Sequence, residues 1–276
     1  MNFISSSACL SDVPHQRAEG GLDLAVALQG ERHRLARFYQ RGSLKARCIR
    51  TGDAIELVAI NISGGMAGGD TASVKMELMA GAKAVFTTQA AERIYRSLGE
   101  VTRVETRLIA GPGAHLMYLP QETILFDGFG LKRSLEIDLA EGASFVGVEG
   151  LVFGRLAMGE VIERGSLSDK ITLRREERLV WRDVSRVEGH VFARLDRPGI
   201  GNGARAMASL IAVGDGMMAK LPAVQNALSG HVAGLSTHDG MILLRLLAAD
   251  SASLRRVVTA ALSMLGNGAL PRVWQS

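Results

Sequence analysis

The sequence predicts a mainly β fold, an elongated stack of β-hairpins or sheets (β-helix-like or a super-sandwich) with two C-terminal helices. Three observations support this prediction. Apolar and polar residues alternate over many short segments bounded by glycine, which is typical of half-buried strands. A strand–turn–strand unit recurs roughly every 30 residues between positions 70 and 150. A helical spacing of apolar residues is found beyond residue 204.

The repeated unit consists of an alternating strand, a glycine followed by alanine, and a second alternating strand. The turn glycines are Gly81, Gly113 and Gly142. Because one unit cannot bury its apolar face alone, successive units are expected to stack on each other. The alternative is a plain β-sandwich whose hairpins look alike because few turn types join paired strands. The predicted strand pairs are 73–78 with 82–89, 103–108 with 114–121, and 134–139 with 143–149.

The chain after the repeat is expected to change character. Pro198 and several glycines predict a loop over 186–203, near a subdomain boundary. The last helix is predicted over 254–265, where apolar residues keep i, i+3, i+4 spacing between a serine start and Gly266. A shorter helix is predicted over 217–228. The strands expected in this part are 170–173 with 178–184, then 206–213 and 240–247.

The domain organisation predicted is a loose N-terminal leader followed by one domain. The leader covers 1–25 and the domain 26–276, with the repeat over about 70–150 and the helix-containing part over about 204–276. Two cysteines, Cys9 and Cys48, without CxxC spacing are typical of a reducing, cytoplasmic protein. The sequence has neither a signal-peptide pattern nor a stretch apolar enough to span a membrane.

The charge pattern argues against a nucleic-acid-binding protein. The net charge is only +4, with 32 basic and 28 acidic residues interleaved over 276 positions. There is no basic block and no zinc-finger pattern, and aromatic residues make up only 5% of the chain. With 47% hydrophobic and 22% charged residues, the composition is that of an ordinary soluble globular protein.

A glycine-rich segment over 61–70 precedes the repeat and contains four glycines among six residues. Since glycine adopts positive φ freely, this backbone must turn tightly or be closely approached. It lacks the Lys-Ser/Thr of a phosphate loop, and the next residues alternate like a strand. Two interpretations stay open: a structural turn with a bulge, or a contact surface for a partner chain formed by Gly68, Gly69 and Asp70.

Carboxylates near predicted strand ends are the most suggestive candidates for chemistry, and they are Glu122, Asp127, Glu149 and Glu160. They could be paired acids of a hydrolase, a path for a hard cation, or salt-bridge partners. The arginines available for such pairs are Arg93, Arg96 and Arg155. No GxSxG motif or recognisable nucleophile is present, and no histidines have local metal-binding spacing. No motif therefore argues for an enzyme.

An ordered set of motifs resembles the UreD (also called UreH) family of urease accessory proteins. The matching motifs run in order from about residue 30 to the end of the chain. They lie at 64–70, 87–97, 119–126, 153–160 and 271–274.

The resemblance implies a non-enzymatic metallochaperone scaffold with an elongated all-β stack and a pair of helices. Such a protein binds apo-urease and, with UreF and the GTPase UreG, supports nickel delivery to the urease metal centre. The resemblance implies that no cofactor is tightly bound and that nickel passes through in transit. It implies binding to neither nucleic acid nor a membrane. The rival interpretations are a carbohydrate-active β-stack enzyme with paired carboxylates, and a plain adaptor without a metal path.

Two hypotheses about residues accompany the resemblance. Tyr95, Arg96 and the 64–70 loop are expected to face UreF or urease. Dispersed oxygen ligands hold Ni²⁺ less tightly than a His/Cys site, which suits a conveyor. The residues expected to line the path are Asp70, Gln89, Gln121, Glu122, Asp127, Glu149 and Glu160.

Overall fold

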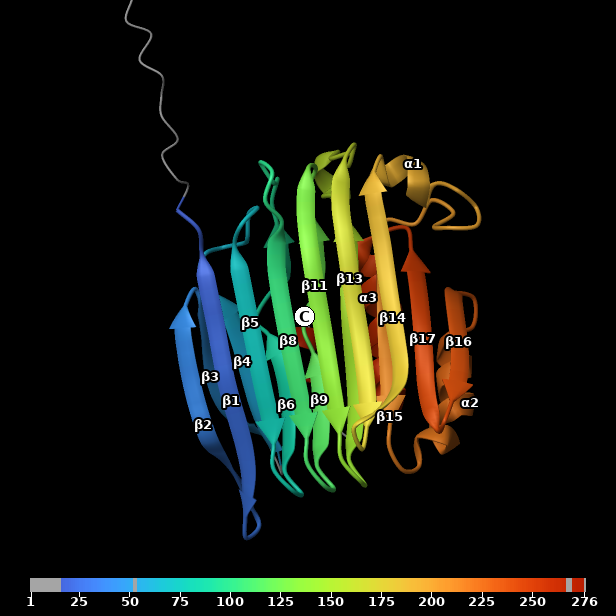
Figure 1. Cartoon of the computed structure of the whole chain (residues 1–276). Coiled ribbons are helices and arrows are strands. Elements are labelled where there is room, and N and C mark those ends of the chain that lie inside the picture. The colour runs from blue at the N-terminus through green and yellow to red at the C-terminus, as the bar shows by residue number, and fades with distance from the viewer. Residues whose placement is uncertain (1–15, 52–53, 267–269, 276) are drawn as a thin grey trace, which may run out of the picture.

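The computed structural model describes residues 16–51, 54–266 and 270–275, and this part of the chain forms two packed β-sheets (Figure 1). Sheet A has, in spatial order, β14 (Arg178–Gly189), β13 (Gly165–Arg175), β11 (Phe129–Leu139), β8 (Thr102–Ala110), β5 (Thr71–Leu78), β1 (Glu19–Gln29) and β2 (Arg32–Gly42). Sheet B has β16 (Val232–His238), β17 (Met241–Ala248), β15 (Ala206–Val213), β12 (Ser144–Phe153), β9 (His115–Leu119), β6 (Lys83–Thr88), β4 (Ala54–Asn61) and β3 (Leu44–Thr51). Two short strands, β7 (Glu92–Ile94) and β10 (Thr123–Leu125), extend sheet B beside β12.

The predicted stacking of the repeated units is confirmed. The first strands of the three units, β5, β8 and β11, pair in parallel within sheet A, and the second strands, β6, β9 and β12, do so in sheet B. The turns stack as well, since Gly81 donates to the carbonyl of Pro112 at 2.9 Å and Gly113 to that of Glu141 at 3.0 Å. Each turn glycine has the same left-handed φ, between 62° and 67°. The mainly β, solenoid-like prediction therefore holds.

The hairpin interpretation of each unit is wrong in its pairing. The two strands of a unit do not hydrogen-bond to each other: β5 pairs with β1 and β8, whereas β6 pairs with β4 and β9. Each unit is an arch that passes from one sheet to the other. The alternation of apolar and polar residues is the same in a hairpin and an arch, because both bury one face.

Antiparallel pairs flank the parallel strands. The predicted pair over 170–173 and 178–184 is found as β13 and β14, which pair over their full lengths. β1 with β2 and β3 with β4 form two further antiparallel pairs. Because β1 begins at Glu19 and buries Leu22 and Leu24, the predicted leader boundary at residue 25 falls inside a strand. Residues 1–15 of that leader lie outside the described residues.

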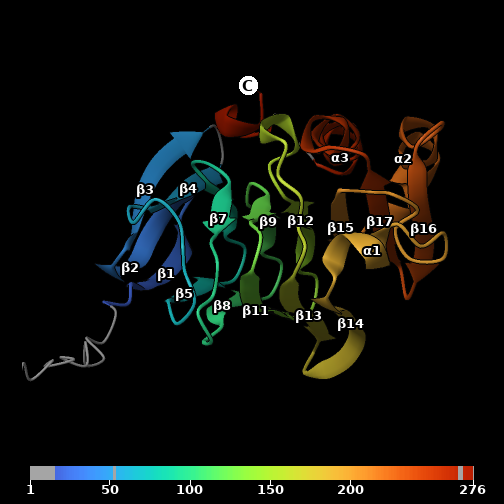
Figure 2. The ribbon, with the colours of Figure 1, turned by 90° about the horizontal axis from the view of Figure 1, so that it is seen from above.

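Apolar side chains form two cores. The first lies between the sheets and includes Phe129 and Phe145. The second lies between the other face of sheet B and the helices α2 (Leu221–Ala227) and α3 (Ser251–Leu265), seen from above in Figure 2. Both predicted helices are present. α3 is capped by Asp250, whose carboxylate accepts from the backbone N–H of Ser253 at 2.7 Å.

The predicted loop over 186–203 is partly structured. β14 continues to Gly189, which pairs with Gly165, and the short helix α1 (Val191–Leu195) follows. Three 3₁₀ turns complete the described elements, namely η1 (Leu156–Met158), η2 (Met217–Lys220) and η3 (Arg272–Trp274).

The connections at the two ends of the stack differ in length. The arches at one end are tight turns around the repeat glycines. At the other end, four segments lead into the neighbouring parallel strands β5, β8, β11 and β13, and all of them except the one between β10 and β11 are longer than the arches. We call these segments (62–70, 95–101, 126–128 and 154–164) the loop end. Since the strands that they enter are adjacent, the loop end is one continuous surface.

Candidate functional site

Aromatic contacts tie the segments of the loop end together. The Tyr95 ring packs so closely on Gly65 that a Cβ there would lie 2.4 Å from it, and the Tyr95 hydroxyl donates to the carbonyl of Gly64 at 3.1 Å. Tyr95 also contacts Phe126, with ring centroids 4.9 Å apart. The guanidinium of Arg155 lies 4.4 Å from the Phe126 centroid. A continuous chain of contacts therefore links all four segments, and it explains why the first of them requires glycine.

Gly68 and Asp70 lie inside the loop end instead of on its surface. A Cβ at Gly68 would lie 2.3 Å from the carbonyl oxygen of Glu100, so the two backbones touch. Asp70 is buried, and its two carboxylate oxygens accept from the backbone N–H groups of Ala18 and Ala67, both at 2.8 Å. Gly69 is half-buried. These residues shape the surface on which Tyr95 and Arg96 are exposed.

Asp127 and Glu160 are brought together at the loop end. Glu160 accepts from the Asp127 backbone N–H at 3.2 Å and from the Arg155 side chain at 2.9 Å. Asp127 pairs with Arg96 at 3.2 Å and accepts from the backbone of Glu163 at 2.8 Å. Partial burial would raise the pKa of Glu160, but hydrogen bonds from Arg155 outweigh it and lower that pKa. Glu160 is therefore ionised at neutral pH. The contacts of both carboxylates hold the loops in place.

Large apolar side chains are exposed on the same surface, and the sequence patterns did not predict their exposure. Leu98 and Met158 are 75% and 76% exposed, and Ile62 and Val161 are 62% and 58% exposed. Each lies in one of the loop-end segments. The sequence feature that could have indicated this exposure is a large apolar residue between turn residues, as in Ser97-Leu98-Gly99.

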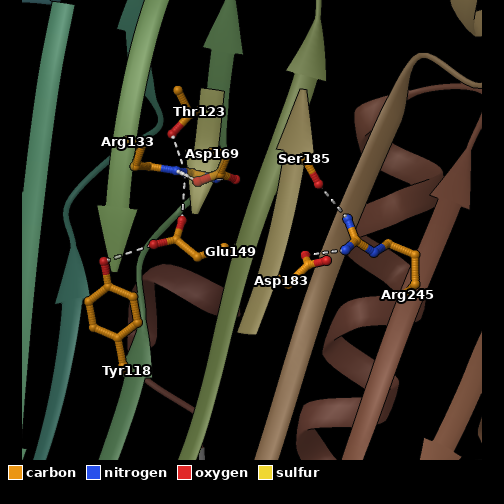
Figure 3. Close-up of polar contacts among 8 residues, drawn as sticks. All are labelled: Tyr118, Thr123, Arg133, Glu149, Asp169, Asp183, Ser185 and Arg245. Carbon is orange, nitrogen blue, oxygen red and sulfur yellow. Dashed lines mark hydrogen bonds and ion pairs between the residues drawn. The ribbon is translucent and has the colours of Figure 1, made fainter. Parts of the chain in front are cut away.

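A second polar site is buried between the sheets (Figure 3). Arg133 of β11 makes a bidentate contact with Asp169 of β13, at 3.0 and 2.7 Å. Its third nitrogen lies 2.6 Å from Glu149 of β12, and Glu149 also accepts from the Tyr118 hydroxyl at 3.1 Å. All four side chains are buried. We call them the inter-sheet cluster, since they join strands of both sheets.

The charges of the inter-sheet cluster do not balance, because one guanidinium faces two carboxylates. Burial raises the pKa of Glu149, and the Arg133 charge offsets this only in part. Burial and the neighbouring Glu149 raise the pKa of Tyr118 well above its usual value. The cluster thus favours a proton or another cation near Glu149.

A third polar group surrounds Arg255 of α3. Arg255 donates to the Gln121 side-chain oxygen at 2.5 Å and to the Val273 carbonyl at 2.7 Å, and it lies 3.5 Å from Glu122. Trp274 stacks near Arg255 and donates to the Leu119 carbonyl at 2.9 Å. The side-chain nitrogen of Gln121 is buried and has no hydrogen-bond partner among the described residues. This group fastens the C-terminal segment to sheet B.

The seven path candidates are therefore spread over several places. Asp127 and Glu160 are in contact, and Gln121 and Glu122 share Arg255. Asp70 and Glu149 are buried separately, and Gln89 is exposed. Among the residues that the structure describes, no three His, Cys, Asp or Glu side chains are grouped so that they could hold a metal ion. Ion pairing, one of the interpretations left open by the sequence, accounts for the contacts of Glu122, Asp127, Glu149 and Glu160.

The fold and these sites define a class of protein: a mainly β scaffold of stacked parallel strands with a helix-covered second sheet and a contoured loop end. The family model described as "UreD urease accessory protein" matches residues 18–275. The chain belongs to this family.

Relatives of similar length bear the same description. A "Urease accessory protein UreD" of Chelativorans sp. (strain BNC1) is 44% identical over 269 residues, which cover 96% of each chain. The protein of that name from Methylobacterium sp. (strain 4-46) is 43% identical over 95% of this chain and 96% of its own. That of Rhizobium etli is 41% identical over 94% of this chain and 96% of its own. Within the described residues, no helix is both long and apolar enough to cross a membrane.

Proposed function

We propose that this chain is a non-catalytic, cytoplasmic scaffold that binds apo-urease and, with UreF and UreG, supports nickel delivery to the urease metal centre. Membership of the UreD family supports a role in urease maturation. The single observation that carries the binding role is the exposed apolar set at the loop end.

The loop end has the properties of a protein-docking surface. Exposed apolar groups on a soluble protein are stabilised when a partner covers them, and arginine and aromatic residues are enriched in such interfaces. Leu98, Met158 and Val161 supply the apolar part, and Tyr95 and Arg96 supply the aromatic and cationic parts. The contacts through Gly65 and Phe126 fix this surface before binding, which reduces the entropy lost on association.

Nickel transit is proposed for the carboxylates of the loop end and the inter-sheet cluster. Asp127 and Glu160 lie at the loop end, where a metal ion would enter from a bound partner. The excess negative charge beside Glu149 would favour a cation deeper in the molecule. Carboxylate oxygens bind Ni²⁺ weakly enough to release it. Among the other candidates, Gln121 and Glu122 share Arg255, whereas Asp70 is buried separately and Gln89 is exposed.

The docking role is tested by Leu98→Asp combined with Met158→Asp. Each change places a charge on a surface that must be desolvated on binding, so affinity should fall at least about tenfold. Binding to purified apo-urease and UreF is measured by biolayer interferometry, and urease activation is measured in parallel. Ile49→Asp combined with Leu179→Asp, at exposed apolar residues of β3 and β14, is the matched control. Full binding by the double variant would contradict the proposal.

The transit role is tested separately with Glu149→Gln. The amide keeps the size of the side chain and hydrogen-bonding capacity but removes one negative charge. The expected result is an intact complex whose urease contains less nickel, measured by elemental analysis. Normal nickel content would favour the plain-adaptor alternative.

A further inference from the structure

A hollow of about 810 Å³ lies on the outer face of sheet A, which faces the viewer in Figure 1. Side chains from the edge strands β2 and β14 and from the parallel strands between them line it. We call this hollow the trough. Its volume is in the range of sites that bind ligands or peptide segments. The trough is separate from the loop-end residues assigned to partner docking above.

Three cations lie next to one another in the trough. In the strand register, Lys132 of β11 is opposite Ser168 of β13, and Ser168 is opposite Arg186 of β14. Lys170 lies two residues beyond Ser168 on the same face and is opposite Ser134 of β11. Neighbouring strands are about 4.8 Å apart, so the three charges form a compact triangle with two serine hydroxyls between them. Anionic groups are what this set of donors would bind.

These three cations have no ion pair among the described residues, whereas two arginines of the trough do. Arg41 pairs with Glu19 at 3.0 Å, and Arg107 pairs with Asp138 at 3.4 Å. Like charges close together on one sheet face repel each other. An anionic partner would remove this repulsion, so the triangle of Lys132, Lys170 and Arg186 is suited to a ligand instead of to internal stability.

Negative charge begins within the trough at Glu105 and Glu136, and more carboxylates follow farther along the same face. A second hollow of about 540 Å³ adjoins the trough and is lined by Glu136, Asp138, Glu176 and Glu177, together with Arg107 and Arg174. A continuous polyanion such as a nucleic acid would be repelled there. An extended polypeptide with one short acidic stretch would meet complementary charge along its whole length.

We propose that the trough binds a short acidic segment of a partner protein through Lys132, Lys170 and Arg186. The inference rests on the proposed scaffold role for the source of that segment. It adds a second binding face, whose cations lie three to five residues along β11, β13 and β14 from the loop end.

The test compares Lys132→Glu/Lys170→Glu with Lys45→Glu/Arg47→Glu on β3 of sheet B, which changes the net charge equally. Affinity for purified apo-urease, UreF and UreG is measured separately at low and high salt. The trough variant should bind one of the three at least about tenfold more weakly at low salt, and the control should bind all three normally. Unchanged melting temperatures show that both variants are folded.

A second experiment, with a peptide in place of the partner proteins, distinguishes failure of this inference from failure of the proposed function. The probes are a fluorescent ten-residue peptide of alternating aspartate and serine and a ten-nucleotide single-stranded DNA. If the trough variant loses peptide binding and the control variant keeps it, the inference about the trough is supported. If the wild type binds none of the three proteins, the proposed function is overturned, but the inference about the trough is not. Equal binding by both variants overturns the inference. Tighter binding of DNA than of peptide, lost in the same variant, would overturn the assignment to a polypeptide.

Discussion

Replacing Arg133 by methionine tests the electrostatics of the inter-sheet cluster. Methionine fills a similar volume without a charge, so the change removes the cation and leaves Glu149 and Asp169 buried together. Removing one partner of a buried ionic group costs about 3–5 kcal/mol of unfolding free energy. For a chain of this size, 1 kcal/mol corresponds to about 2–4 °C, so the melting temperature should fall by roughly 6–20 °C at neutral pH.

The pH dependence of this variant gives the sharper measurement. Burial already raises the pKa of Glu149 above 4.5, and without Arg133 the opposing influence is lost. The folded variant then binds protons more tightly than the unfolded chain. Its unfolding free energy should therefore increase as the pH is lowered from neutrality towards the unfolded pKa, and fall as the pH rises. Acid should stabilise this variant relative to the wild type.

The assay is thermal and urea unfolding followed by circular dichroism between about pH 5 and pH 8. Arg107→Met is the matched control, because Arg107 lies on the adjacent strand β8 but makes an exposed pair with Asp138 at 3.4 Å. That control should cost less than about 1 kcal/mol and show no acid rescue. Equal destabilisation by the two changes, or an Arg133→Met variant insensitive to pH, would refute the reasoning.

Three further predictions concern single positions. Glu149→Gln should make the unfolding free energy less dependent on pH above pH 4.5. The raised pKa of Glu149 makes the wild type lose up to about 1.4 kcal/mol of unfolding free energy per pH unit as the carboxyl ionises, and urea unfolding at a series of pH values measures this. Gly113→Ala should lower the unfolding free energy by about 1 kcal/mol, since the turn needs a φ of 62° although there is room for a Cβ. Gly147→Ala is the comparison, because the φ of Gly147 is not positive and the added Cβ would meet the Phe145 ring. Asp250→Ala should cost about 1 kcal/mol in thermal melts by removing the cap of α3, and Asp215→Ala, outside any helix cap, should not.

The repeat shows how far the sequence could predict the fold. Alternation and the equivalent glycines Gly81, Gly113 and Gly142 were sufficient to predict stacked units. They could not show that each unit is an arch, because the pairing of a strand depends on residues far along the chain. The same limit applies to β1, whose buried residues Leu22 and Leu24 are covered by sheet B and not by neighbours in sequence.

The candidate sites were predictable only in part. Tyr95 and Arg96 were identified through the family motifs, and both are exposed at the loop end. Leu98 and Met158 were missed because an apolar residue in a loop is usually buried by its surroundings, and only the structure shows its exposure. Asp70 was expected at the surface, but backbone donors from Ala18 and Ala67 enclose it.

The sequence by itself determined the β class, the stacking period, the two helices and the resemblance to the UreD family. These features depend on local alternation, turn chemistry and ordered motifs, all of which are written along the chain. Only the tertiary structure decided how the strands of the repeat pair, that Arg133, Glu149 and Asp169 meet between the sheets, and that Lys132, Lys170 and Arg186 share one face. Those contacts join residues more than 15 positions apart. Their energies depend on burial and distance, which a sequence does not contain.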